Sequence, residues 1–311
     1  MMDFDKISHL LTPPDDWQWS EFHNKNNQKI RYGFNTPDNA KALVIIAEGR
    51  TEIIEEYFEA IRDFNARGFA VAMMDWQGQG LSYRYNDDNS RQHSVGYEQD
   101  ISDFDEFLGH IDIDLPQILF AHSMGGNITL RYLANTKNNF KCAYFVAPML
   151  GLKPKRVIRY MGKAILNLAT RFGALGKYAL GQGAWNERFA NTAKHKVSSD
   201  TVRREVQPYL FKTKPELRCG GVTFGWLAEA LKSIAILHQT DTGSRISTPV
   251  FMALAGDDFV VDNDGAHETA KSIPDCIVQI FPTSQHQIHR ERDEIRNACL
   301  QSFYNFAEKH L

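Results

Sequence analysis

The stretch Gln117-Ile118-Leu119-Phe120-Ala121-His122-Ser123-Met124-Gly125-Gly126 decides the fold, because it joins an apolar run to a helical pattern through a serine. An unalternating apolar run is typical of a strand that is buried on both faces of a sheet. Where such a strand turns sharply into a helix, small residues such as Ala121 and Gly125 relieve the crowded backbone, and the serine hydroxyl is left exposed. The stretch therefore predicts a strand, a tight turn and a helix, with Ser123 as candidate nucleophile. The plainer alternative is a serine that only caps a helix.

Other short apolar runs share this pattern and end in turn residues: Ala42–Ala47, Phe69–Met74, Cys142–Val146, Val250–Leu254 and Cys276–Phe281. Longer segments with helical spacing lie between the early runs: Glu55–Ala66, Asp100–His110 and Met124–Asn135. Strands that alternate with helices are typical of an α/β protein with a mostly parallel central sheet flanked by helices. The polar, alternating segment Trp17–Tyr32 predicts an antiparallel edge of this sheet.

The strand pattern stops between Val146 and Val250, over a distance too long for a loop in a compact domain. We expect a helical cap inserted over residues 151–245, between a first core part at 1–150 and a second core part at 246–311. From 151 to 180 there is no acidic residue, and the cations here are Lys153, Lys155, Arg156, Arg159, Lys163, Arg171 and Lys177. This 153–177 stretch predicts peripheral contact with an anionic membrane, although a solvated helix face explains it about as well.

The 311 residues carry a formal net charge of -3 and are 43% hydrophobic. This composition excludes a disordered or collagen-like chain and argues against a nucleic-acid partner. The four cysteines form no closely spaced pair, so we expect free, buried thiols at Cys142, Cys219, Cys276 and Cys299. The first residues lack a secretory leader, and no apolar run approaches the ~20 residues of a spanning helix. We therefore expect a cytoplasmic protein, peripheral at the inner face of the membrane if the basic stretch binds there.

A serine hydroxyl needs a general base, and the base needs an acid that orients it. When the serine lies at such a strand-to-helix turn, the chain order is serine, acid, histidine. Asp257 and Asp258 follow one late predicted strand, and His286 follows the last. We predict Asp258 as the acid, because it stands at the end of its turn, and His286 as the base. Asp257 remains the alternative acid, and His289 is a competing histidine that we expect to point elsewhere.

An oxyanion hole needs two backbone N–H donors. One donor is expected at Met124, directly after the candidate nucleophile, and the other in the turn after an early strand. In that turn Arg50 supplies the N–H, and Gly49 lets the backbone approach.

No pattern in the sequence requires a metal or an organic cofactor. Gly78-Gln79-Gly80 follows a predicted strand, but Tyr83 stands where a dinucleotide-binding loop has its third glycine. His267 and Glu268 are not followed by the second histidine of a zinc-protease helix, because that position is Lys271. We therefore expect no cofactor.

Several motifs resemble the α/β-hydrolase superfamily, and within it the monoacylglycerol lipase and lysophospholipase branch, most closely the bacterial lysophospholipase L2 group. The matching pieces occur in order over about residues 25 to 308 and comprise 49–52, 75–82, 121–126, 221–227, 255–262 and 286–291. The resemblance implies an α/β-hydrolase fold with a helical cap. It also supports Asp258 as the acid, because the fourth residue of the matching turn has this role in the branch.

The resemblance implies a serine hydrolase that cleaves carboxylic esters and releases a fatty acid from a single-chain lipid. The chain has Glu48-Gly49 where monoacylglycerol lipases have His-Gly, which favours the lysophospholipase side. A monoacylglycerol lipase or a general carboxylesterase is the alternative. Peptide, thioester or carbon–carbon hydrolysis would use the same three residues, and a catalytically silent binding protein of this fold is the remaining hypothesis.

Overall fold

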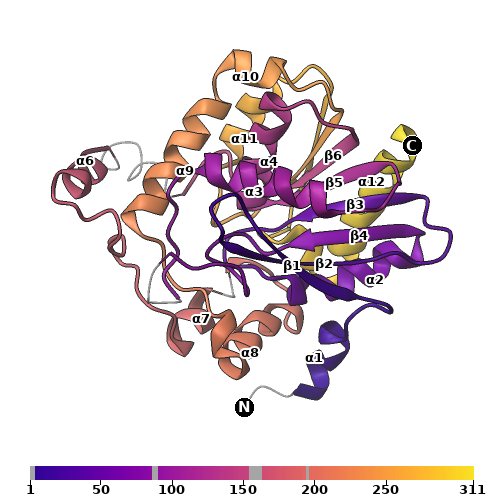
Figure 1. Ribbon diagram of the computed structural model, residues 1–311, viewed down its shortest axis with the longest axis horizontal. Coiled ribbons are helices and arrows are strands. Elements are labelled where there is room, and N and C mark those ends of the chain that lie inside the picture. Colours follow the sequence, from indigo (N-terminus) through magenta and orange to yellow (C-terminus); the bar gives the residue numbers. More distant parts are fainter. Residues whose placement is uncertain (1–3, 86–89, 154–162, 194–195) are drawn as a thin grey trace.

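The computed structural model describes residues 4–85, 90–153, 163–193 and 196–311. An eight-stranded sheet forms its centre (Figure 1), in the spatial order β1-β2-β4-β3-β5-β6-β7-β8. The strands are β1 (Gln18–His23), β2 (Lys29–Asn35), β3 (Ala42–Ala47), β4 (Phe69–Met74), β5 (Gln117–His122), β6 (Phe140–Val146), β7 (Val250–Ala255) and β8 (Cys276–Phe281). Each predicted apolar run forms one of these strands.

The sheet is parallel from β4 through β8. At its other end β2 runs antiparallel to β4, and β1 runs antiparallel to β2. The predicted antiparallel edge is therefore confirmed, with Gln18 opposite Phe34 in the outer pair. Together with the flanking helices, this arrangement is the α/β-hydrolase fold that the sequence predicts. Because all the parallel strands end at the same edge, the turns after β3, β5, β7 and β8 lie together there.

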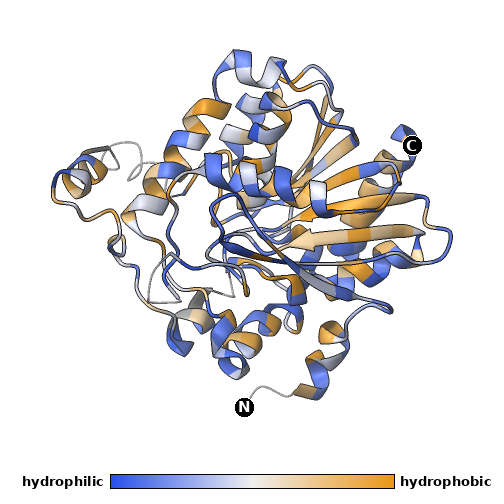
Figure 2. Ribbon diagram, in the orientation of Figure 1, coloured by the Kyte–Doolittle hydropathy of each residue, from blue (hydrophilic) through white to orange (hydrophobic). Residues whose placement is uncertain are grey.

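Helices cover both faces of the sheet. Successive side chains of β3 point to opposite faces, and because all of them are apolar, both faces must be covered. Leu43 and Ile45 pack with α3 (Tyr97–His110), α4 (Ser123–Asn135), α9 (Phe224–Leu237) and α11 (Asn263–Ala270). Val44 and Ile46 pack on the other face with α2 (Phe58–Ala66) and α12 (Asp293–His310). Figure 2 shows the result, with apolar strands inside and helices that are polar on their outer sides.

The described residues between β6 and β7 form helices, turns and isolated bridges but no further strand. The elements are α6 (Lys163–Arg171), α7 (Glu187–Ala193), η4 (Arg203–Glu205), α8 (Val206–Thr213), η5 (Pro215–Leu217), α9 and α10 (Thr240–Ser244). Helices α7 and α8 lie away from the sheet, close to α1 (Phe4–Leu11), and α9 packs on α4 (Figure 1). The division at 151 and 245 stays a prediction, and the cations Lys155, Arg156 and Arg159 lie outside the described residues.

Two expectations about burial are wrong. Strand β8 is not buried on both faces, because it is the last strand of the sheet and leaves Ile277 41% and Ile280 49% exposed. All four cysteines are free, but Cys276 at the start of β8 is only half-buried. In the part of the chain that the structure describes, no helix has the length and apolar character needed to span a bilayer.

Candidate active site

The predicted nucleophile lies where β5 turns into α4. Ser123 has a φ of 50°, a left-handed conformation that is strained for a residue with a Cβ atom. The helix after it packs closely on the end of β3, since a Cβ at Gly125 would lie 2.4 Å from the carbonyl oxygen of Ala47. The small residue two positions after the serine is therefore required by the backbone contact, as the sequence predicts.

His286 and Asp258 complete a chain of hydrogen bonds to this serine. Nε2 of His286 lies 2.9 Å from Oγ of Ser123, and Nδ1 of His286 lies 2.7 Å from Oδ2 of Asp258. All three residues are buried, whereas Asp257 is exposed. The structure thus brings together the three side chains that the sequence nominates, and it leaves the alternative acid outside the arrangement.

The surroundings of Asp258 favour its charged form. Burial by itself would raise the pKa of this carboxyl group, but the charge and hydrogen bond of His286 hold the pKa below its ordinary value. The second oxygen, Oδ1, accepts hydrogen bonds from the backbone N–H groups of Val260 and Val261, at 2.7 and 2.9 Å. An ionised, fixed carboxylate can orient the imidazole so that its Nε2 faces the serine.

The turn after β3 offers one free N–H group. The N–H groups of Gly49 and Thr51 donate to Oε2 of Glu52 and Oε1 of Gln79, and the N–H of Glu52 faces the carbonyl of Gly49. Arg50 is the residue of this turn whose N–H has no partner within the described residues. Met124 lies in the first turn of α4, where helical N–H groups lack partners inside the helix. Both predicted oxyanion donors therefore lie at the edge of the sheet where Ser123 is found.

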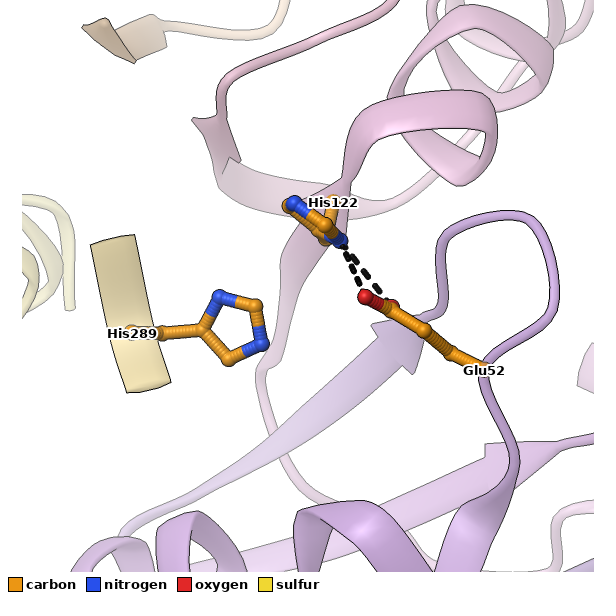
Figure 3. Close-up of side chains that lie close together, drawn as sticks. All are labelled: Glu52, His122 and His289. Carbon is orange, nitrogen blue, oxygen red and sulfur yellow. Dashed lines mark hydrogen bonds and ion pairs between the residues drawn. The ribbon is translucent and has the colours of Figure 1, made fainter. Parts of the chain in front are cut away.

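A second carboxylate–imidazole pair, Glu52 and His122, lies next to the pair of Asp258 and His286. This second pair was not predicted from the sequence. Figure 3 shows Glu52, from the turn after β3, pointing at His122, which directly precedes Ser123. Nδ1 of His122 is 2.9 Å from both carboxylate oxygens, and its Nε2 is 3.3 Å from the carbonyl oxygen of His286. Because both ring nitrogens face oxygen acceptors, each is placed to donate, and the ring joins the serine turn to the histidine loop.

Glu52 is saturated with donors. Besides His122 and Gly49, it accepts hydrogen bonds from the hydroxyl of Tyr57 and Nε2 of Gln287, each at 2.6 Å. Burial would raise the pKa of Glu52, but the charge and hydrogen bond of His122 dominate and hold that pKa well below its ordinary value. Glu52 is therefore a buried carboxylate that His122 and three neutral donors hold in place.

His289 lies beside this pair and points toward it (Figure 3). It is buried, stacks on Tyr57, and has no hydrogen-bond partner among the described residues at either ring nitrogen. Burial lowers its pKa well below the ordinary value, so the ring is neutral. Glu52, His122 and His289 offer three atoms within 4.8 Å of one another, the only such group among the described residues that could hold a metal ion. An ion there would have to displace the donors that already saturate Glu52, so the contacts favour a hydrogen-bonded cluster.

The loop that carries His286 is held by the segment before α8. The N–H of Gln287 donates to the carbonyl of Val197 at 2.7 Å. Ser199 donates from its N–H and hydroxyl to the carboxylate of Glu291, and Ser198 donates its hydroxyl to the carbonyl of Arg290. The histidine is therefore positioned partly from the region predicted as a cap.

A cavity of about 470 Å³ opens over Ser123 and His286. This volume lies in the range of small-molecule sites. Part of its wall is apolar, formed by Met149, Leu152, Val222, Trp226, Leu227 and Phe259. The rest is polar and carries several cations, supplied by Arg50, Lys153, Lys196, Arg204 and Arg290. The site can thus take a molecule that has both an apolar and a polar end.

Sequence reasoning missed the buried cluster and the charged wall. Glu52 and His122 both stand in motifs that were singled out, but nothing in their spacing shows that they touch across 70 residues. The strongest available signal was the ionisable residue directly before Ser123, a position that must be buried if the strand is. The role of the Arg50 side chain was not predicted, because only the backbone N–H of this residue was considered at the level of sequence.

Comparison with known proteins agrees with this geometry. The chain is 26% identical to the probable lysophospholipase L2 of Haemophilus influenzae over 96% of this chain and 95% of that one. It is 27% identical to lysophospholipase L2 of Escherichia coli, over 94% and 87% of the two chains. A soluble variant of monoglyceride lipase from Saccharomyces cerevisiae, solved with a substrate analog, superposes with a TM-score of 0.75 at 18% identity over 96% of each chain.

The family model Hydrolase_4, described as serine aminopeptidase, S33, matches residues 38–293. This match covers most of the chain and includes the strand-to-helix turn, both carboxylate–imidazole pairs and the cavity wall. The chain therefore belongs to this family of serine hydrolases with the α/β-hydrolase fold.

Proposed function

We propose that the protein is a serine carboxylic-ester hydrolase that releases a fatty acid from a single-chain lipid, and that its substrate is a lysophospholipid. The observation that carries the proposal is the hydrogen-bonded chain Ser123–His286–Asp258 at a cavity with one apolar and one cationic wall. The relatives named lysophospholipase L2, aligned over nearly their whole length, support the same substrate class.

In the proposed mechanism His286 takes the proton of the Ser123 hydroxyl at Nε2 as Oγ attacks the ester carbonyl. The carbonyl oxygen becomes an oxyanion that accepts hydrogen bonds from the N–H groups of Arg50 and Met124. His286 then passes its proton to the departing alcohol oxygen, and the acyl group stays on Ser123. Water, deprotonated by the same imidazole, attacks the acyl ester and releases the fatty acid. Asp258 stabilises the imidazolium in both halves.

The residues of the cavity wall favour a lipid substrate over a peptide substrate. A peptide with a free amino terminus needs a carboxylate to receive its ammonium group. The two acidic residues of the wall are already paired within the protein, Glu52 with His122 and Glu56 with Arg290. The apolar wall suits an acyl chain. A monoacylglycerol lipase or general carboxylesterase is the second candidate, favoured by the likeness to the yeast monoglyceride lipase.

Fatty-acid release from a matched panel tests the proposal. The panel holds lysophospholipids and a monoacylglycerol of equal chain length, a short ester and a peptide amide. We expect the highest kcat/KM on a lysophospholipid, and loss of all release in Ser123→Ala. Ser244→Ala, at an exposed serine of α10, is the control and should retain activity. Release from peptide alone, or no release that depends on Ser123, would overturn the proposal.

A fluorophosphonate probe separates an enzyme from a silent binding protein. The probe reacts with an activated serine, so we expect labelling of the wild type and of Ser244→Ala but not of Ser123→Ala. Labelling that survives Ser123→Ala would place the reactive serine elsewhere. The predicted membrane contact at 153–177 remains a proposal, tested by vesicle binding after neutralising Lys155, Arg156 and Arg159.

A further inference from the structure

The charged wall of the cavity has more positive than negative side chains, and its acids are already neutralised. The lining cations are Arg50, Lys153, Lys196, Arg204 and Arg290, and the lining acids are Glu52 and Glu56. Glu56 pairs with Arg290 and Glu52 with His122. The other four cations have no carboxylate partner among the described residues. The cavity therefore carries positive charge that nothing in this part of the chain offsets.

Arg50 is the most informative of these cations, because its side chain is partly shielded from water. Its guanidinium lies 5.6 Å from the centroid of the Trp226 ring, and Nη1 reaches the carbonyl oxygen of Gly220 only at 3.4 Å. Burial lowers the pKa of Arg50. The opposite holds for Arg203, whose contacts with Glu59 raise its pKa despite burial. Shielding a guanidinium from water without a carboxylate partner costs free energy, which a bound anion would offset.

Arg204 adds an independent observation. It lines the same cavity, and its Nε is buried with no hydrogen-bond partner in the described part of the chain. Buried donors are nearly always satisfied, so this N–H at the cavity wall is available to an acceptor on a bound molecule. The two segments that carry these arginines are in contact, because Nε2 of Gln207, three residues after Arg204, donates to the carbonyl of Thr51, the residue after Arg50. The turn after β3 and η4 thus each contribute an arginine to the wall of the same cavity.

We propose that Arg50 and Arg204 bind the phosphate of a single-chain phospholipid in this cavity and thereby select it over the uncharged monoacylglycerol. Guanidinium groups suit this role, because they offer paired N–H donors to phosphate oxygens. The acyl chain then lies along the apolar wall, with the ester between the two walls and next to Ser123. The assignment rests on the proposed lipid-ester activity and names the group that the polar wall recognises.

A pair of ether lipids tests this without hydrolysis by the serine: 1-O-dodecylglycerol 3-phosphate and 1-O-dodecylglycerol, which differ by the phosphate alone and have no carboxylic ester. Calorimetric titration of the wild type should show at least tenfold tighter binding of the phosphate. Arg50→Gln and Arg204→Gln should each reduce that preference by about 10- to 100-fold or abolish it. The control is Arg67→Gln, which removes an exposed arginine that also stacks on a ring, that of Tyr304, and should keep the full preference.

A kinetic measurement repeats the test on substrates. The ratio of kcat/KM for a lysophospholipid to kcat/KM for the matching monoacylglycerol should fall by about 10- to 100-fold in Arg50→Gln and in Arg204→Gln. Equal wild-type binding of the two ether lipids, or an unchanged preference in both variants, would overturn the phosphate site. Failure of the proposed function is distinguishable, because it would appear as no Ser123-dependent release from any lipid, whatever the ether lipids do.

Discussion

Nδ1 of His122 lies 2.9 Å from both carboxylate oxygens of Glu52, directly beneath the serine that follows His122 in the chain. The contact ties the turn after β3, which carries one predicted oxyanion donor, to the strand that carries the predicted nucleophile. Nε2 of the same imidazole, that of His122, lies 3.3 Å from the carbonyl oxygen of His286. One buried pair therefore holds the three segments from which the site is built.

Replacing Glu52 by Gln should destabilise the fold. The amide has nearly the same size, but it removes the charge opposite His122 and turns an NH₂ group toward other donors. Loss of one partner of a buried pair costs about 3–5 kcal/mol, so urea unfolding should show a loss of this order. Glu308→Gln, at the exposed pair with Lys41, should cost less than about 1 kcal/mol. Equal effects in the two variants would contradict the structural role of Glu52.

Asp258→Asn and Asp257→Asn form a matched test of the predicted acid. The first should lower kcat by about 10⁴-fold, because an amide cannot hold the imidazole with Nε2 free to accept the serine proton. The second changes an exposed neighbour and should leave kcat within a few-fold of the wild type. Circular dichroism checks that both variants are folded. A large loss in Asp257→Asn with little change in Asp258→Asn would reverse the assignment.

Gly125→Ala should reduce both stability and fatty-acid release. The added methyl group would lie 2.4 Å from the carbonyl oxygen of Ala47, so α4 must shift away from the turn that carries Arg50. Overpacking of this kind costs about 1–3 kcal/mol. Gly109→Ala is the control, since its Cβ meets nothing within 4 Å on the exposed side of α3. It should keep or slightly raise the melting temperature. A Gly125→Ala enzyme with wild-type activity would show that the contact is not required.

Glu56 gives the fold a dependence on pH. Burial raises the pKa of Glu56 to about 7 from an ordinary 4.5, against the pull of Arg290. Because the folded state holds this proton more tightly than the unfolded chain, stability falls as pH rises from about 4.5 through about 7. The loss from this group reaches about 3 kcal/mol at most.

Urea unfolding at pH 5 and pH 8 measures this dependence. Glu56→Gln, although destabilised overall by the loss of the Arg290 partner, should show a smaller drop between the two pH values than the wild type. Glu308→Gln should keep the wild-type drop, because that carboxylate is exposed. An undiminished drop in Glu56→Gln would assign the pH dependence to other groups.

The sequence allowed the fold to be predicted closely, because buried parallel strands are continuous apolar runs and each run is visible in isolation. The position of β8 was the exception. Its apolar residues resemble those of a central strand, and only the order of strands in the sheet shows that it is an edge with Ile277 and Ile280 exposed.

The site, too, has residues that the sequence pattern predicts and residues that it does not. Ser123, Asp258 and His286 could be nominated because each follows a recognisable strand, and the structure places them in hydrogen-bonding contact. The Glu52–His122 pair and the charge of the Arg50 side chain could not be predicted, since they depend on which turns meet at one edge of the sheet. Local pattern carries no information on such contacts.

The anchoring of the His286 loop has a practical consequence for protein engineering. Val197, Ser198 and Ser199 hold the backbone and side chains of residues 287–291, although they belong to the long segment between β6 and β7. A truncated enzyme, trimmed to the sheet and its flanking helices, would lose these tethers together with the roof of the cavity. Attempts to graft a different roof for new specificity should therefore retain residues 197–203 as part of the scaffold.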